Sequence, residues 1–109
     1  MQVKIVGRHM DVPENLRGYI EEKISKLPRF YDRVMDIEVI IDGEKSDRRI
    51  EIVVSVPGHP DFVAEHRSDD LFASFDLCLD RIEKQIRRFK DKVRDRKHHA
   101  GGRKESGGE

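Results

Sequence analysis

The sequence predicts an α+β fold, a two-layer sandwich of one four-stranded sheet with two helices on one face, in the order β-α-β-β-β-α. Two observations carry this prediction. Four short segments alternate apolar and polar residues, as half-buried strands do, and two longer segments repeat apolar residues every three to four positions, as amphipathic helices do. Because strands and helices do not alternate regularly, we expect both helices on one face and water on the other.

The N-terminal part predicts a strand followed by a helix. The strand covers residues 2–8, and the helix runs from Pro13 to Lys26, since proline is favoured in the first turn of a helix. Pro28 disfavours helical conformation at the residue before it and therefore ends this helix. The apolar positions that face the core are Val3 and Ile5 in the strand and Leu16, Ile20, Ile24 and Leu27 in the helix.

Three strands and a long helix are expected next. The strands cover residues 36–42, 48–56 and 61–67. A polar turn containing Gly43 joins the first two, and the Pro57–Pro60 turn joins the second to the third. Ser68 or Asp69 is expected to cap the final helix, which reaches Arg96. Its apolar face comprises Leu71, Phe75, Cys78, Leu79, Ile82, Ile86, Phe89 and Val93.

Length and composition point to one small domain. The chain has 109 residues, 36% of them hydrophobic and 40% charged, so we expect one core over residues 1–97. Residues 98–109 contain four glycines and no periodic apolar residue, which predicts a flexible glycine-rich tail. A single cysteine, no secretory signal and no membrane-spanning run favour a cytoplasmic protein without membrane contact.

The formal net charge is zero, but the charges are unevenly distributed. Residues 41–80 hold four basic and ten acidic side chains, whereas residues 81–99 hold nine basic and three acidic ones. One turn of a helix, about 5.4 Å, is close to the phosphate spacing of a nucleic-acid strand. Two rows are therefore candidates for phosphate binding: Arg81, Lys84 or Gln85, Arg88 and Lys92 on the final helix, and Lys23, Lys26, Arg29 and Arg33 on the first helix and its exit.

The structural alternative is a solvated face of an ordinary surface helix. For one isolated helix that interpretation would be favoured, but the excess of cations beside an acidic remainder favours a polyanionic partner. The two rows form one patch if the two helices pack side by side.

The sequence shows no residue pattern that predicts a catalytic site or a metal site. His98 and His99 lack a third ligand at zinc spacing, and Cys78 on an apolar helix face is expected to be a small buried hydrophobe. No glycine-rich phosphate loop precedes a helix. We therefore expect no enzyme activity, no cofactor and no metal.

Several segments resemble one known family. They are residues 70–76 (DLFASFD), 80–86 (DRIEKQI), 90–93 (KDKV), 1–8 (MQVKIVGR) and 26–33. Together they resemble the ribosome hibernation-promoting factor family, the ribosome-associated inhibitor or protein Y group, from Met1 to about Arg96.

The resemblance implies a fold akin to double-stranded-RNA-binding domains and a monomeric domain that docks on the small ribosomal subunit where messenger and transfer RNA would sit. Translation is then inhibited and the idle ribosome is preserved. Positions that the resemblance places on ribosomal RNA are Lys23, Lys26, Arg29, Arg81, Lys84, Gln85, Arg88 and Lys92. Longer family members add a linker and a second domain, so a short form and a truncated long form both remain open.

A different class of function is a protein-binding regulator that docks a transcription or translation partner through its sheet. Its association would tolerate salt, whereas binding to RNA phosphates would not. Aromatic residues available for stacking on bases are few, and Phe30 and Tyr31 are the only ones expected to be exposed. We therefore expect recognition of RNA shape and phosphate rather than of base sequence.

Overall fold

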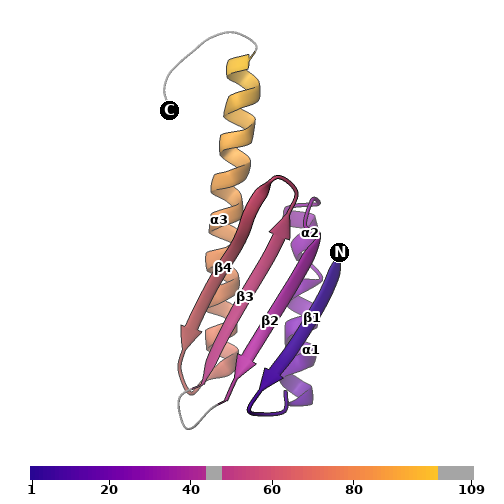
Figure 1. The fold of residues 1–109 in the computed structure, drawn as a ribbon, viewed down its shortest axis with the longest axis vertical. Coiled ribbons are helices and arrows are strands. Elements are labelled where there is room, and N and C mark those ends of the chain that lie inside the picture. The colour runs from indigo at the N-terminus through magenta and orange to yellow at the C-terminus, as the bar shows by residue number, and fades with distance from the viewer. Residues whose placement is uncertain (44–47, 101–109) are drawn as a thin grey trace.

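The structure, a computed structural model, describes residues 1–43 and 48–100, with side chains described as far as residue 94. It confirms the α+β fold with its four strands and two main helices (Figure 1). The elements are β1 (Gln2–Arg8), α1 (Glu14–Ile24), α2 (Leu27–Phe30), β2 (Asp36–Asp42), β3 (Arg49–Val56), β4 (His59–Arg67) and α3 (Leu71–Ala100).

The four strands form one mixed sheet in the order β1-β2-β3-β4. β1 pairs parallel with β2, with Ile5 opposite Val39, because α1 and α2 return the chain to the same end of the sheet. The β2–β3 and β3–β4 pairs are antiparallel and form a meander. β4 is consequently an edge strand, and no other strand of the described residues pairs with its outer side.

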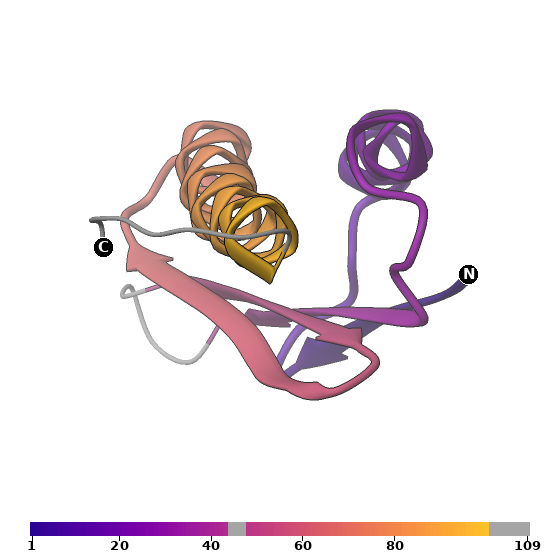
Figure 2. The ribbon, with the colours of Figure 1, turned by 90° about the horizontal axis from the view of Figure 1, so that it is seen from above.

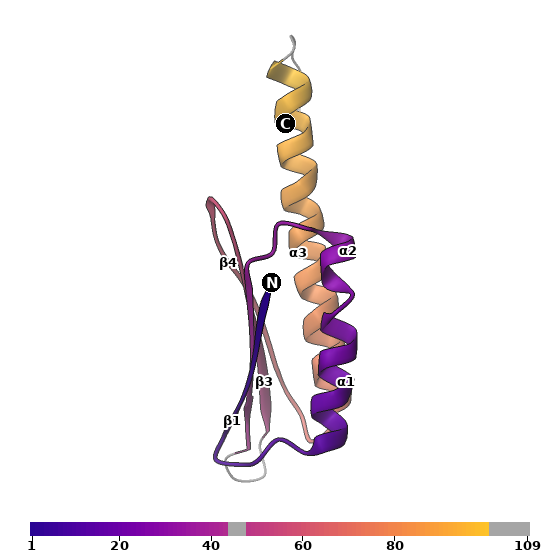
Figure 3. The ribbon, with the colours of Figure 1, turned by 90° about the vertical axis from the view of Figure 1, so that its right-hand side faces the viewer.

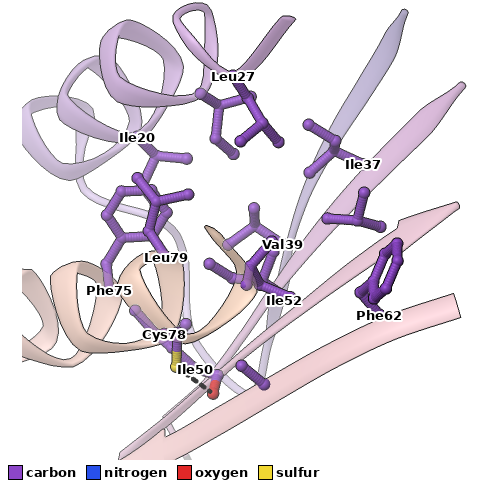
Figure 4. Close-up of a cluster of buried hydrophobic side chains, with 14 of the residues drawn as sticks. Ile20, Leu27, Ile37, Val39, Ile50, Ile52, Phe62, Phe75, Cys78 and Leu79 are labelled. Atoms are coloured by element: carbon purple, nitrogen blue, oxygen red, sulfur yellow. Dashed lines mark hydrogen bonds between the residues drawn. The ribbon is translucent and has the colours of Figure 1, made fainter. Parts of the chain in front are cut away.

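Both main helices cover the same face of the sheet, and none of the described helices lies on the opposite face (Figure 2). α3 packs on β3 and β4, while α1 lies beside it on the same layer. Most of the buried residues follow the predicted periods: alternate residues of β2 and β3 and the apolar stripes of α1 and α3 form one core (Figure 4). Fully buried examples are Ile20, Val39, Ile52, Phe75 and Ile82. Val3, predicted to face the core, is exposed instead, because it lies near the start of the edge strand β1.

The helix junctions differ from the prediction. α1 ends at Ile24, and a further short helix, α2, begins at Leu27 and places Pro28 in its first turn. Proline is tolerated there because the first amide groups of a helix have no partner within the helix. Leu27, which Pro28 is expected to keep out of helical conformation, is the first residue of α2, and α1 ends before its predicted end at Lys26. Pro28 therefore lies at the start of a helix and not after the end of one, and that prediction is wrong.

The cap of α3 also differs from the prediction, which named Ser68 or Asp69. The side chain of Asp70 accepts a hydrogen bond from the backbone N–H of Ala73 (3.1 Å), the geometry of an N-cap. Ser68 instead donates to the Asp70 carbonyl oxygen (3.0 Å) and bonds the buried Ser74 hydroxyl (2.7 Å). These bonds hold Ser68 in the connection, so the helix begins at Leu71.

α1 and β3 each begin one residue later than predicted, at Glu14 and Arg49, and two further element ends differ by more. β4 begins at His59 instead of Asp61, because Gly58 turns the chain tightly with a φ of 69° and lets His59 pair with Val56. α3 continues to Ala100 instead of ending at Arg96, since no glycine or proline interrupts the sequence before Gly101. The rest of the predicted tail, residues 101–109, lies outside the described residues.

Candidate nucleic-acid interface

Four of the predicted residues lie along one side of α3. Arg81, Gln85, Arg88 and Lys92 occupy positions i, i+4, i+7 and i+11, so they follow one another along the helix. Residues of the same turns, Ile82 and Ile86, are fully buried against the sheet. The row therefore borders the core, and it runs beside the edge strand β4. We call these four residues the β4-side row.

The first two members of the β4-side row bind the edge of β4. An Nη of Arg81 donates to the Glu65 carbonyl oxygen (3.2 Å), and Nε2 of Gln85 donates to the Val63 carbonyl oxygen (3.0 Å). These bonds satisfy acceptors that an edge strand leaves unpaired, and they cover an edge on which another chain would otherwise pair. They also fix the two side chains in place.

The outer two members are exposed and available to a partner. Within the described part of the chain, Arg88 and Lys92 form no ion pair. Lys84, in contrast, lies on the solvent side of α3 and pairs with Asp80 at 3.1 Å. Both side chains of that pair are more than half exposed, so the pair contributes little to stability and an RNA phosphate can compete for the lysine.

The remaining predicted residues lie on the other side of α3. Lys23 and Lys26 line a hollow of about 350 Å³ between α1 and α3, together with three carboxylates, Asp76, Asp80 and Glu83. The two predicted basic rows are therefore not adjacent, because an acidic stretch of α3 separates them. The sequence could not show which side of α3 faces α1.

Beside this hollow, Tyr19 of α1 contacts residues of α3. The Tyr19 hydroxyl donates to the Asp76 carboxylate (2.7 Å to one oxygen), and this hydrogen bond raises the pKa of Tyr19. The Tyr19 ring meets Phe72 edge to face, with centroids 5.1 Å apart, and lies 5.3 Å from the Lys23 ammonium. Lys23 is thus held against α1 by its aromatic neighbour.

Arg29 is exposed on α2, and its neighbour in sequence, Phe30, contacts two cations of α3 that the sequence prediction did not single out. The Arg87 guanidinium and the Lys90 ammonium lie 5.4 Å and 4.8 Å from the centre of the Phe30 ring, and Lys90 donates to the Phe30 carbonyl oxygen (2.7 Å). The spacing of Arg87, Lys90 and Arg94 is i, i+3, i+7, which was a usable signal in the sequence. Arg94 pairs with Asp91 at 2.9 Å.

Phe30 and Tyr31 are half-buried, so the prediction that they are exposed is wrong. Phe30 is covered by the two cations above, and the Tyr31 ring packs edge to face against Phe89, with centroids 6.1 Å apart. Among the described aromatic residues, Phe72 has the exposed ring, at 36%. These contacts are tertiary, and a helix period alone does not reveal them.

The charges of α3 are therefore divided along its length. Residues 71–80 carry two acidic and no basic side chains, and residues 81–94 carry seven basic and two acidic ones. Beyond the level of α2 the helix extends past the end of the sheet (Figure 3). Cations lie on both sides of this C-terminal half, with Arg88 and Lys92 on one side and Arg87, Lys90 and Arg94 on the other. We call this half the basic half of α3.

The uncovered face of the sheet carries charges of both signs. Strand alternation places Glu38, Glu51 and Glu65 there, on β2, β3 and β4, and it also places Lys4 and Arg8 of β1 there. At one end of the sheet Arg49 pairs with Glu65 (2.9 Å) and Glu51 (3.6 Å). A polyanion would therefore meet mixed charges on this face but an excess of cations on the basic half of α3.

The described residues contain no group of three or more histidine, cysteine or acidic side chains placed to hold a metal ion. Cys78 is buried, and its Sγ lies 3.8 Å from the Ile50 carbonyl oxygen (Figure 4). Burial raises the pKa of the Cys78 thiol to about 11, so the thiolate needed of a nucleophile is scarce at neutral pH. In the part of the chain that is described, no helix is both long and apolar enough for a transmembrane span.

Comparison with known proteins identifies the family. The model of the family described as Sigma 54 modulation protein / S30EA ribosomal protein matches residues 3–94. The chain belongs to this family. The match covers the whole sheet from Val3, all three helices as far as residue 94, and every predicted RNA-binding position.

Relatives in the S30EA family carry the name that the sequence resemblance suggested. The ribosome hibernation promoting factor of Azotobacter vinelandii is 40% identical over 88% of this chain and 89% of its own length. The ribosome hibernation promoting factor of Escherichia coli K12 is 28% identical over 86% of this chain and 98% of its own length. The ribosome hibernation promotion factor of Deinococcus radiodurans is 36% identical over 83% of this chain, but only 50% of its own length is covered.

Solved structures of the S30EA family share the fold. The ribosomal subunit interface protein of Coxiella burnetii superposes with a TM-score of 0.76 at 25% identity, over 84% of this chain and 99% of that one. The N-terminal domain of Thermus thermophilus protein Y superposes with a TM-score of 0.70 at 32% identity, over 82% of this chain and 99% of that domain. The resemblance to the hibernation-promoting factor and protein Y group is thereby confirmed.

Proposed function

We propose that this protein is a ribosome hibernation factor that binds the small ribosomal subunit in the channel for messenger and transfer RNA and thereby inhibits translation. The observation that carries the proposal is the basic half of α3, present in a chain whose relatives are named as hibernation factors. The role is binding, in the cytoplasm and without a cofactor, and it needs no catalytic residue.

The physical mechanism is occupation of a site by a preformed body. A rigid two-layer domain loses little conformational freedom on binding, so its cations retain most of the attraction they gain from phosphates. Arg88 and Lys92 are the strongest contributors, because they are exposed and form no ion pair within the described residues. Arg81 and Gln85 hold the β4 edge and present a second, weaker set of donors.

Lys23, Lys26 and Arg29 contribute from the other side of α3 in this proposal. The carboxylates between the two groups then set an orientation, since phosphates are repelled from Asp76, Asp80 and Glu83 and attracted on either side. Lys84 joins them when an RNA phosphate replaces Asp80 as its partner.

Reversing the two unpaired cations tests the proposal. The double variant Arg88→Glu, Lys92→Glu should cosediment with purified small subunits at least tenfold less well and should fail to inhibit translation in a reconstituted system. Its fold should persist, because both side chains are exposed. A matched control is Lys4→Glu, Arg8→Glu, which makes the same change in charge on exposed residues of β1 and should bind as the wild type does.

Unchanged cosedimentation of the Arg88, Lys92 variant would contradict the proposal. The same assay separates the alternative of a regulator that docks through its sheet. For that function, binding would persist in high salt and the β1 control would lose it, because Lys4 and Arg8 border the uncovered sheet face.

A further inference from the structure

A hollow of about 390 Å³ lies at the outer end of the β4-side row, between α3 and the turn that joins β3 to β4. Its α3 wall includes Arg88, Phe89 and Lys92, and its other wall includes His59 and Asp61. The sequence patterns do not place His59 or Phe89 in a binding site. The hollow combines aromatic rings with cations that form no ion pair within the described residues. A site for phosphate alone would need the cations but not the rings.

The aromatic floor is preorganised. The His59 ring stacks on Phe62 with centroids 4.6 Å apart and planes 20° from parallel, and it lies 4.6 Å from Phe89. Phe62 is buried, whereas His59 and Phe89 are half-buried and line the hollow. Nδ1 of His59 lies 2.6 Å from the Pro60 carbonyl oxygen. Because a carbonyl only accepts, Nδ1 carries the proton, and Nε2 is left for another partner.

The charged groups beside this floor are cations. Arg88 and Lys92 offer donors for a phosphate on the α3 side, and neither forms an ion pair within the described residues. Asp61 lies on the adjacent strand, but its carboxylate accepts a hydrogen bond from Ser55 (3.0 Å) on the uncovered face of the sheet, so it points away from α3. A ligand with a flat ring and one phosphate fits both the aromatic floor and the cations.

We propose that the hollow holds one unpaired nucleotide of RNA. The base stacks on His59 and Phe89, and the phosphate pairs with Arg88 and Lys92. Stacking of a base on an aromatic side chain tolerates any base, so the site adds affinity without strict sequence choice. The inference rests on the proposed function for the source of that nucleotide, which is an unpaired position of ribosomal RNA.

The test compares a labelled six-nucleotide single-stranded RNA with the same strand lacking its two central bases, by fluorescence anisotropy at low salt with the full chain. The wild type should prefer the intact strand by about 5- to 100-fold. His59→Leu should bind both strands equally, and His59→Tyr should keep the preference because it keeps a ring. Phe72→Leu, which removes an exposed ring far along α3, is the matched control and should behave as the wild type does.

Three results would overturn the inference: no binding of the intact strand by the wild type, equal binding of the two strands by the wild type, or an unchanged preference in His59→Leu. Thermal unfolding followed by circular dichroism establishes that each variant is folded. Cosedimentation with small subunits keeps the two proposals separate. If Arg88→Glu, Lys92→Glu abolishes cosedimentation while the strand preference is absent, the proposed function stands and the nucleotide site does not.

Discussion

Cys78 shows how burial alone decides the chemistry of one residue. It lies on the apolar face of α3, within the core, and its sulfur meets a backbone carbonyl rather than a base or a cation. Desolvation is the main reason that its pKa is raised, and Arg81 opposes the rise only in part. The sequence predicted a buried cysteine from helical spacing, and the structure confirms it.

The raised pKa of Cys78 makes stability depend on pH in the alkaline range. The pKa lies at about 11 in the folded protein against an ordinary value of 9.0, so the folded state retains the proton longer than the unfolded chain does. This contribution to the free energy of unfolding is fully present below pH 9 and is lost as the pH rises through 11. The loss at pH 11 should amount to about 2 kcal/mol.

The measurement is urea unfolding of the wild type and Cys78→Ala at pH 7, 9 and 11. At pH 7 the alanine variant should be less stable, because it loses a buried sulfur. The stability gap should narrow as the pH rises, since only the wild type has this thiol to ionise. Tyr19, whose pKa is also raised, titrates in both proteins and cancels in the difference. A gap that stays constant from pH 7 to 11 would contradict the assignment.

At the scale of elements, periodicity predicted which segments form strands and helices but not how their ends are made. The strands at 2–8 and 36–42 have the predicted bounds, although alternation is interrupted in each by adjacent apolar residues, at positions 5–6 and 39–41. The ends that differ depend on contacts the sequence does not display, such as the bond of Ser68 to Ser74 that leaves Asp70 as the cap. Which residue caps a helix therefore depends on the tertiary contacts of the candidate residues as well as on their type.

Alanine substitutions at two glycines of regular elements should change the free energy of unfolding in opposite directions. Gly18 lies on the exposed side of α1, and a Cβ added there would meet no atom within 4 Å, so Gly18→Ala should stabilise the protein by roughly 0.5–1 kcal/mol through helix propensity. At Gly7 of β1, an added Cβ would approach the Met10 carbonyl oxygen to 2.5 Å. Gly7→Ala should therefore destabilise the protein by roughly 1–3 kcal/mol.

Urea unfolding of the two alanine variants under identical conditions checks this pair of predictions. Because both substitutions add the same methyl group, their difference reports the local environment alone. Equal changes in the free energy of unfolding would show that the chain after β1 does not approach Gly7 as closely as the structure indicates.

At the scale of the whole molecule, the sequence showed that basic residues gather near the C-terminus but not how they are arranged around the fold. A helical row such as Arg81, Gln85, Arg88 and Lys92 follows from spacing alone. Its position beside β4, and the separation of that row from Lys23 and Lys26 by acidic residues, depend on how α3 is rotated on the sheet. The missed residues, His59 and Phe89 above all, come together only through the β3–β4 turn.

This separation of charge predicts the salt dependence of ribosome binding by a protein whose net charge is zero. If about five to eight phosphates are contacted, log affinity should fall with log salt concentration with a slope of roughly 4 to 7. Arg88→Gln and Lys92→Gln should each lower that slope by about one, because each removes one phosphate contact. His59→Leu should weaken binding without changing the slope, since stacking releases no counterions.

Lys4→Gln on β1 is the control, because it removes an equal charge at an exposed site away from α3. It should leave both affinity and slope unchanged. The measurement is cosedimentation with purified small subunits at four or more salt concentrations. Were Lys4→Gln to lower the slope as much as Lys92→Gln does, the attraction would come from charge spread over the whole surface, and α3 would have no special part in binding.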